Sequence, residues 1–227
     1  MVTVINATFF GGDKKFKSVV DQPTFEGVEY ILYTNRPEVA EGTNWKSIKL
    51  EPINNDPRLG ARYIKSSIHS FHPESKFWLW IDSNMKIVTN PDILVQKYLV
   101  NHNICVMPHP ERHNWYEEAS LVAQGRDSVE NVQRAIDKYY GEGFPPTSLY
   151  ETGCLLRRNT ELVQDFNNTW WKEIQENSIR DQVSFPYAAW KHGVAINTFP
   201  GTNSINSSRY QAKKYLPQWN EIVRDWN

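Results

Sequence analysis

Short runs of β-branched and aromatic residues alternate along the chain with longer stretches in which apolar residues recur at helical spacing. The short runs predict strands and the longer stretches predict helices. The predicted strands are 3–9, 29–34, 45–50, 77–81, 85–88, 104–107, 152–156 and 194–198. The predicted helices are 57–72, 91–98, 115–123, 128–140, 160–176 and 180–192, with a short last helix within 201–227. This alternation predicts an α/β fold with a mostly parallel central sheet flanked by helices.

The most hydrophobic predicted strand has the sequence Phe-Trp-Leu-Trp-Ile and covers residues 77–81. Its lack of alternation is typical of a central parallel strand that is covered on both faces. Ligands bind beyond the carboxyl ends of such strands, so the tripeptide that follows, Asp82-Ser83-Asn84, is the first candidate site. The oxygens of Asp82 and Asn84 can reach one divalent cation, which can bridge the two phosphates of a nucleotide-sugar. A polar turn that ends a buried strand explains the same three residues.

Three cations share one face of the first predicted helix, because Arg58, Arg62 and Lys65 are spaced at i, i+4 and i+7. On an enzyme this face would meet phosphate, and Arg58 lies in the first turn, where the helix dipole favours an anion. A solvated helical face is the alternative. Tyr33 and Asn35 end the second predicted strand, where they would contact a base and nucleoside, and a strand-terminating turn is equally compatible with them.

Composition excludes several classes of protein. The 227 residues suffice for one domain, 1–227, and 40% hydrophobic with 22% charged residues is ordinary globular usage. A net charge of -1 argues against a dedicated nucleic-acid binder. The aromatic content of 13% favours carbohydrate binding, although core packing explains each aromatic residue taken singly.

The sequence also bears on the compartment. The apolar start lacks a basic region and ends at Gly11-Gly12, so it predicts a strand and not a signal peptide. No apolar run approaches the ~20 residues that span a bilayer. Cys105 and Cys154 lie in apolar, strand-like segments, as expected of buried thiols. We therefore expect a soluble, cytoplasmic protein without a membrane span.

Many short motifs in a fixed order resemble one known family. They are Tyr33-Thr34-Asn35, Arg58 with Arg62 and Lys65, Trp80-Ile81-Asp82-Ser83-Asn84, His109-Pro110-Glu111-Arg112, Tyr116-Glu117-Glu118-Ala119, Glu151-Thr152-Gly153, Arg157-Arg158-Asn159, Trp170-Trp171 and Arg180-Asp181-Gln182-Val183-Ser184-Phe185. Together they resemble the domain-of-unknown-function 616 family, also called the TOD1/MUCI70 glycosyltransferase-like domain. The resemblance implies a GT-A-type fold and a nucleoside-diphosphate-sugar donor, with a UDP-sugar favoured, assisted by Mn²⁺ or Mg²⁺.

The resemblance also implies roles for single residues. Enzymes of the GT-A type usually carry Asp-x-Asp, whereas this chain has Asn84 at the third place, which removes one charge and weakens metal binding in the absence of the diphosphate. A late histidine often completes the metal site in such enzymes, and His192 stands at that place. In the resembled family the pair Asp181-Gln182 lines the active site, which favours Asp181 as the base or as a ligand of a sugar hydroxyl.

Further acid–base and sugar-binding candidates come from the sequence itself. Glu151, at a strand start, is the second candidate for the base. Glu117 and Glu118 point to opposite sides of a helix, so at most one of them reaches a cleft. With Glu118, the neighbouring His109 and Arg112 predict a segment that binds the acceptor or the sugar, and a solvated loop would look the same.

These observations favour a glycosyltransferase that moves a hexose or deoxyhexose from a nucleoside-diphosphate-sugar to a hydroxyl of a glycan acceptor. One alternative is an inactive module that binds nucleotide-sugar or carbohydrate. A second is a metal-dependent hydrolase of a sugar-phosphate or glycoconjugate, in which Asp82, Asn84 and His192 would hold the metal.

Overall fold

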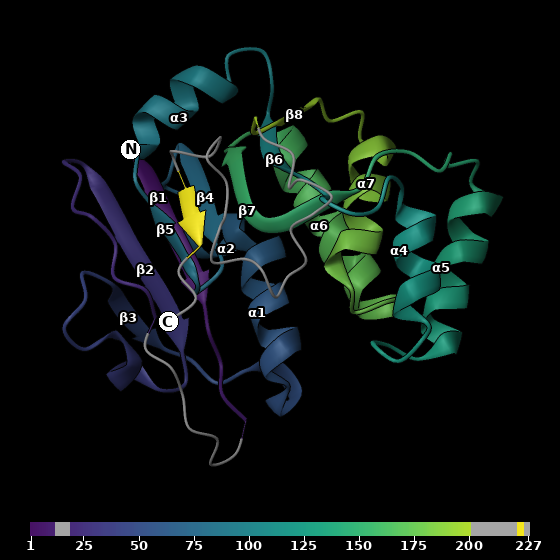
Figure 1. The fold of residues 1–227 in the computed structure, drawn as a ribbon, viewed down its shortest axis with the longest axis horizontal. Coiled ribbons are helices and arrows are strands. Elements are labelled where there is room, and N and C mark those ends of the chain that lie inside the picture. Colours follow the sequence, from purple (N-terminus) through teal and green to yellow (C-terminus); the bar gives the residue numbers. More distant parts are fainter. Residues whose placement is uncertain (12–18, 201–221, 225–227) are drawn as a thin grey trace.

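The structure is a computed structural model that describes residues 1–11, 19–200 and 222–224. Its centre is a seven-stranded sheet of order β3-β2-β1-β4-β7-β6-β8, with helices on both faces (Figure 1). The strands are β1 Val2–Ala7, β2 Val28–Thr34, β3 Lys46–Lys49, β4 Phe77–Ile81, β6 Ile104–Pro108, β7 Tyr150–Arg158 and β8 Ile196–Thr198. The predicted α/β class with a mostly parallel sheet is confirmed.

One strand runs against the others. β7 pairs antiparallel with both β4 and β6, whereas the other neighbours in the sheet pair parallel. The start of β7 therefore lies at the edge where β1 and β4 end. The pairing of β6 with β7 shifts register there, since Val106 pairs with Leu155 but Met107 pairs with Glu151. Such bulges re-aim side chains and are common beside active sites.

The helices match the predicted segments closely. They are α1 Pro57–Ser66, α2 Ile68–Phe71, α3 Pro91–Tyr98, α4 Trp115–Val122, α5 Val129–Gly141, α6 Glu161–Glu176 and α7 Asp181–Lys191, with short 3₁₀ turns at Pro37–Ala40 and Ile53–Asn55. Asp56 caps α1 by accepting hydrogen bonds from the backbone of Arg58 and Leu59. The segment predicted as one helix, 57–72, is divided, because Ser67 leaves the helical conformation between α1 and α2.

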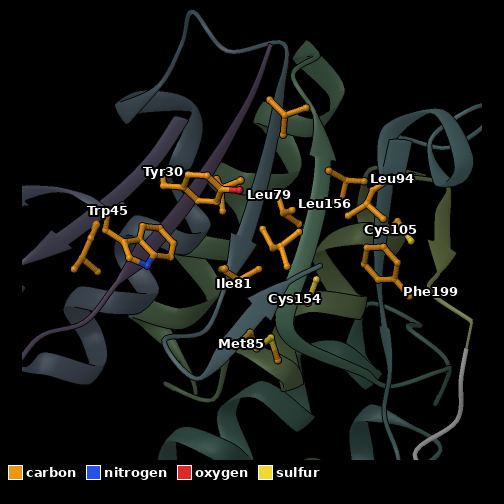
Figure 2. Close-up of a cluster of buried hydrophobic side chains, with 14 of the residues drawn as sticks. Tyr30, Trp45, Leu79, Ile81, Met85, Leu94, Cys105, Cys154, Leu156 and Phe199 are labelled. Atoms are coloured by element: carbon orange, nitrogen blue, oxygen red, sulfur yellow. The ribbon is translucent and has the colours of Figure 1, made fainter. Parts of the chain in front are cut away.

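Hydrophobic clusters lie on both faces of the sheet, as the unbroken apolar run of β4 predicts. Leu79 and Ile81 point into the cluster shown in Figure 2, which is completed from α3 and β5 (Met85–Ile87). Trp78 and Trp80 point to the opposite face and pack with residues of α1, α6 and α7. Since successive side chains of a strand alternate, Asp82 follows on the side of Trp80. Cys105 and Cys154 are buried in β6 and β7, as predicted.

A third cluster joins α4, α5 and α7 at the side of the molecule away from β2 and β3 (Figure 1). Trp115 stacks on Phe144, and Tyr139 stacks on Tyr187 with ring centroids 4.0 Å apart. Many of the chain's aromatic rings thus pack its cores, so the aromatic content by itself does not indicate a sugar site. α7 contributes to two of the three clusters, and this packing fixes the position of the helix.

The predicted last helix lies outside the described residues except for 222–224, which form strand β9 (Ile222–Arg224) against β5. Among the described residues, no helix is both long and apolar enough to cross a membrane.

Candidate active site

A cavity of about 440 Å³ opens at the sheet edge where β1 and β4 end and β7 begins. We call it the aspartate pocket. It is lined by Asn6, Ala7, Thr8, Ala61, Arg62, Lys65, Trp80, Asp82, Ser83, Asn84, Glu151, Thr152, Gly153, Arg180, Asp181 and Gln182. Four segments that are far apart in sequence thus meet here with the first turn of α7, and the pocket brings together eight of the residues predicted for the site.

The turn after β4 is held tightly in place. The Asp82 backbone N–H donates to the Gly153 carbonyl at 2.8 Å, and the Asp82 carbonyl accepts from Met85 at 2.9 Å. The indole N–H of Trp80 donates to Oδ1 of Asp82 at 3.1 Å. Gly153 has no side chain, and a Cβ at this position would lie 2.9 Å from Oδ2 of Asp82. The Asp82 carboxylate is therefore oriented by Trp80, and with any larger residue at position 153 Asp82 or Met85 would have to shift.

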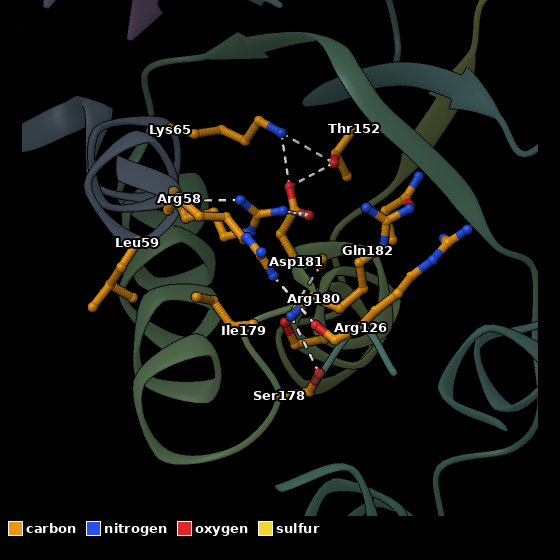
Figure 3. A network of polar contacts seen from close by, with 12 residues as sticks. Arg58, Leu59, Lys65, Arg126, Thr152, Ser178, Ile179, Arg180, Asp181 and Gln182 are labelled. Carbon is orange, nitrogen blue, oxygen red and sulfur yellow. Dashed lines mark hydrogen bonds and ion pairs between the residues drawn. The ribbon is translucent and has the colours of Figure 1, made fainter. Parts of the chain in front are cut away.

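Opposite this turn, a buried ion-pair network links α1 to α7. Lys65 Nζ donates to Oδ2 of Asp181 at 2.7 Å and to the Thr152 hydroxyl at 3.1 Å, and Thr152 donates to the same Oδ2 at 2.7 Å (Figure 3). Arg62 approaches the other carboxylate oxygen at 3.5 Å. Lys65 also lies 5.2 Å from the centre of the Trp80 ring, a cation–π contact. Trp80 thus contacts both halves of the pocket.

The electrostatics of Asp181 follow from these contacts. Burial alone would raise the pKa of its carboxyl, but the cations Lys65, Arg62 and Arg180 outweigh burial and hold the pKa well below its usual range. Asp181 is therefore ionised at neutral pH and is a weak proton acceptor. Of the two roles predicted for it, the ion pairs favour a ligand of a sugar hydroxyl over a general base.

Gln182 and Glu151 complete the polar lining. Gln182 donates from its side chain to the Tyr150 carbonyl at 3.1 Å, and its side-chain oxygen is buried and has no hydrogen-bond partner among the described residues. Gln182 therefore lines the aspartate pocket with one acceptor that has no partner among the described residues. Glu151 is the second residue of β7 and lines the same pocket, so the second candidate for a base also lies in the site.

The predicted sugar-binding residues His109, Arg112 and Glu118 do not line the aspartate pocket, and Glu118 contacts it through Arg180. Glu118 is fully buried and binds Arg180 at 2.6 Å and Arg112 on its other side. Burial would raise the pKa of Glu118, but these two guanidinium groups lower it. Burial and Arg112 lower the pKa of His109 to about 4, so its ring is neutral at pH 7. Glu118 thus positions Arg180, while Glu117 is exposed, as the helical spacing predicts.

Tyr33 and Asn35, predicted to bind the nucleoside, are placed elsewhere by the structure. The Tyr33 ring packs against Phe71 in the core and its hydroxyl pairs with His72 at 3.0 Å, while burial raises its pKa to about 12. The Asn35 side chain binds both the N–H and the carbonyl of Phe10 and so ties the ends of β1 and β2 together. The alternative of a strand-terminating role fits these contacts better.

His192, predicted to join Asp82 and Asn84 at a metal, does not line the aspartate pocket. α7 begins at the pocket with Asp181, and His192 follows its eleventh residue, about 16 Å further along the helix axis. There His192 pairs with the Thr169 hydroxyl at 2.7 Å. In the described part of the chain no group of three His, Cys, Asp or Glu side chains is arranged to hold a metal. The separation follows from the length of α7, which agrees with the predicted helix 180–192.

Asp82, Ser83 and Asn84 still provide ligands that suit a weakly held divalent cation. Magnesium commonly uses one or two carboxylates, with water and substrate phosphates filling the remaining positions. The pocket lining carries three cations, Arg62, Lys65 and Arg180, and three carboxylates, Asp82, Glu151 and Asp181. Because these charges cancel, a bound diphosphate would bring uncompensated negative charge, which a divalent cation at Asp82 would offset.

Eight lining residues were not predicted for the site: Asn6, Ala7, Thr8, Ala61, Trp80, Thr152, Gly153 and Arg180. The last four of these lie within the motifs quoted for the family resemblance. Their positions next to Asp82, Glu151 and Asp181 were the available signal, but their roles depend on contacts between distant segments. Arg58, predicted to bind phosphate, lies outside the aspartate pocket and lines a neighbouring cavity.

Comparison with known proteins identifies the family. The profile of the TOD1/MUCI70 glycosyltransferase-like domain matches residues 13–206. The chain belongs to this family. Among solved structures, the apo structure of the bifunctional glycosyltransferase WbbM superposes on 94% of this chain and 47% of that chain, with a TM-score of 0.53 and 10% sequence identity. That likeness concerns the fold, and it agrees with a glycosyltransferase-like domain.

Two relatives in the TOD1/MUCI70 family come from Arabidopsis thaliana. Alkaline ceramidase TOD1 is 24% identical over 190 residues, which cover 76% of this chain and 41% of that protein. The probable hexosyltransferase MUCI70 is 27% identical over 142 residues, which cover 57% of this chain and 24% of that protein. The chain spans less than half the length of either relative. Their names describe different activities, so membership of the family does not by itself define the reaction.

Proposed function

We propose that this chain is a GT-A-type glycosyltransferase that moves a hexose or deoxyhexose from a nucleoside-diphosphate-sugar to a hydroxyl of a glycan. The observation that carries the proposal is the aspartate pocket, in which the Asp82 turn faces the Lys65–Asp181 network across one cavity. This site lies beyond the carboxyl ends of β1 and β4, where α/β sheets bind nucleotides.

The pocket suggests a role for each group. Asp82 and Asn84 would hold a divalent cation on the diphosphate, and that cation would stabilise charge on the departing group. Arg62, Lys65 and Arg180 would contact phosphate oxygens, Asp181 and Gln182 would bind sugar hydroxyls, and Glu151 would accept the proton of the acceptor hydroxyl. The first turn of α7 adds its positive dipole end.

The polarity of the pocket supports a sugar-nucleotide over a lipid. Twelve of the sixteen lining residues have polar side chains, and the others are Ala7, Ala61, Trp80 and Gly153. A ceramide would need a largely apolar surface for its hydrocarbon chains. The activity in the name of the ceramidase relative is therefore the less favoured alternative for this chain.

The test is to incubate the protein with UDP- and GDP-sugars, with and without Mn²⁺, and to measure release of the nucleoside diphosphate. Asp82→Asn keeps the size of the side chain but removes its charge, and we expect it to lower activity by at least about 100-fold, as loss of a key charge-stabilising group does. Glu117→Gln, an exposed carboxylate on α4, is the matched control and should behave like the wild type.

Three outcomes would argue against the proposal. Donor binding without turnover across the whole panel would favour a binding module. Hydrolysis of ceramide by the wild type in the absence of any donor would favour the alternative activity. Full activity of the Asp82→Asn variant would show that the site lies elsewhere.

A further inference from the structure

A second cavity, of about 410 Å³, adjoins the aspartate pocket. We call it the arginine pocket, because Arg58, Arg62, Arg126 and Arg180 line it together with Gly125 and Ile179. The arginines come from α1, from the segment between α4 and α5, and from the residue before α7; Figure 3 labels Arg58, Arg126 and Arg180. Arg62 and Arg180 line both cavities, so a ligand in one lies directly beside a ligand in the other.

The arginine pocket has positive charge and no lining carboxylate among the described residues. Arg62 pairs with Asp181 and Arg180 with Glu118, but neither carboxylate lines this cavity. Arg58 and Arg126 are exposed and form no ion pair in the part of the chain that the structure describes. Arg58 instead donates to the Arg126 carbonyl at 3.3 Å.

The acids nearest in sequence are already engaged with the backbone. Asp56 accepts from the backbone of the first turn of α1. Asp127 accepts from the Ser178 hydroxyl at 2.8 Å and from the backbone N–H of Ile179 at 2.7 Å. In addition, Nε of Arg62 is buried without a hydrogen-bond partner among the described residues. Converging guanidinium groups repel one another, and they bind carboxylates and phosphates in a bidentate manner. The cavity is therefore built for an oxyanion.

The position of the cavity indicates which substrate carries that anion. The Asp82 turn, where the proposed function places the donor diphosphate, does not line the arginine pocket. Arg62 and Arg180 line both cavities, whereas Arg58 and Arg126 line only the arginine pocket and are left for an anion of a second molecule beside the donor. We propose, on the basis of the proposed function, that the arginine pocket binds an anionic group, a carboxylate or a phosphate, of an acidic saccharide acceptor.

The experiment measures binding by calorimetry without any donor. The ligands are a uronic-acid trisaccharide, the same trisaccharide with its carboxyl groups reduced to alcohols, and a hexose 6-phosphate. We expect the uronic-acid trisaccharide, the hexose 6-phosphate or both to bind, the reduced form to bind at least about tenfold more weakly, and affinity to fall with added salt. Arg126→Gln should weaken binding about tenfold, whereas Arg134→Gln, an exposed arginine on α5, should leave it unchanged.

Each result separates this proposal from the proposed function. Arg126-dependent binding of only the uronate or only the phosphate identifies the anion and supports the pocket. Equal binding of the acidic and reduced trisaccharides, no binding of any of the three ligands, or no effect of Arg126→Gln overturns the proposal even if the protein releases nucleoside diphosphate from a donor. If Arg126→Gln weakens the binding of a nucleotide-sugar to the same extent, the anion is the donor's diphosphate and the acceptor assignment is wrong.

Discussion

The aspartate pocket and the arginine pocket share Arg62 and Arg180 but differ in how their charges are balanced. In the first, three cations face three carboxylates, and the Lys65–Asp181 pair is buried and linked to Thr152. In the second, four arginines converge without a lining acid among the described residues. A buried charge needs a countercharge within the protein because it has lost its solvation by water. A charge that is open to solvent stays hydrated and can remain unpaired until a ligand binds.

This difference indicates what each cavity recognises. A pocket that is already neutral selects a ligand through hydrogen bonds and through a cation carried with the ligand. A pocket with excess positive charge attracts any accessible oxyanion, with a strength that depends on salt. The carboxylates that pair with the two shared arginines, Asp181 and Glu118, do not line the arginine pocket, so Arg62 and Arg180 can contact ligands in both cavities.

The largest expected effect comes from breaking the balance of the aspartate pocket. Asp181→Asn leaves Lys65 and Arg62 without their buried countercharge, and removing one partner of a buried pair costs about 3–5 kcal/mol. Urea unfolding measures the change. Glu176→Gln breaks the exposed Lys172–Glu176 pair and should change the free energy of unfolding by less than about 0.5 kcal/mol. Equal effects of the two substitutions would show that the buried network stabilises the fold no more than an exposed ion pair does.

The next effect tests the close approach of the Asp82 carboxylate to Gly153. Gly153→Ala places a Cβ 2.9 Å from Asp82 Oδ2 and from the Met85 methyl group, so Asp82 must shift. We expect a cost in stability of about 1–3 kcal/mol and loss of most donor-dependent activity. Gly141→Ala is the matched control, because a Cβ there meets nothing within 4 Å. A fully active Gly153→Ala enzyme would mean that the position of Asp82 is not critical.

Acid should protonate the carboxylates that pair with the buried cations and so lower the stability of the protein gradually. Folding lowers the pKa of Asp181 and of Glu118, so their contribution to stability is complete above the unfolded pKa values of about 4 and is lost as pH falls through the lower folded values. We expect the free energy of unfolding to fall between pH 5 and pH 3, and to fall less in Glu118→Gln. Urea titrations at several pH values measure this. An identical acid dependence in the wild type and the variant would contradict the assignment.

The fold and half of the site could be predicted from the sequence, for reasons that lie in particular residues. The unbroken apolar run of β4 and the Asp56-Pro57 cap are local signals, and they located the central strand, α1 and the Asp82 turn. Tyr33 was misplaced because its position depends on the packing of α2 against the sheet. His192 was misplaced because its role came from the family resemblance, whereas the predicted helix 180–192 already separates it from Asp181. The arginine pocket was not predicted because Arg58 and Arg126 are far apart in sequence and come into contact only in the folded chain.

The smallest expected effect is the change in the free energy of unfolding when one positive charge of the arginine pocket is removed. Arg126→Gln removes one of four like charges from an exposed position, so at low salt the free energy of unfolding should stay level or rise, within about 0.5 kcal/mol. Arg134→Gln should instead lower it slightly, because Arg134 hydrogen-bonds Asn131 and lies one helical turn from Glu130 and Asp137. Adding phosphate should raise the melting temperature of the wild type and of Arg134→Gln more than that of Arg126→Gln, since a bound anion stabilises the folded state by mass action. Equal shifts in melting temperature for all three proteins would mean that phosphate acts through general solvent effects. The four arginines would then not form a phosphate site.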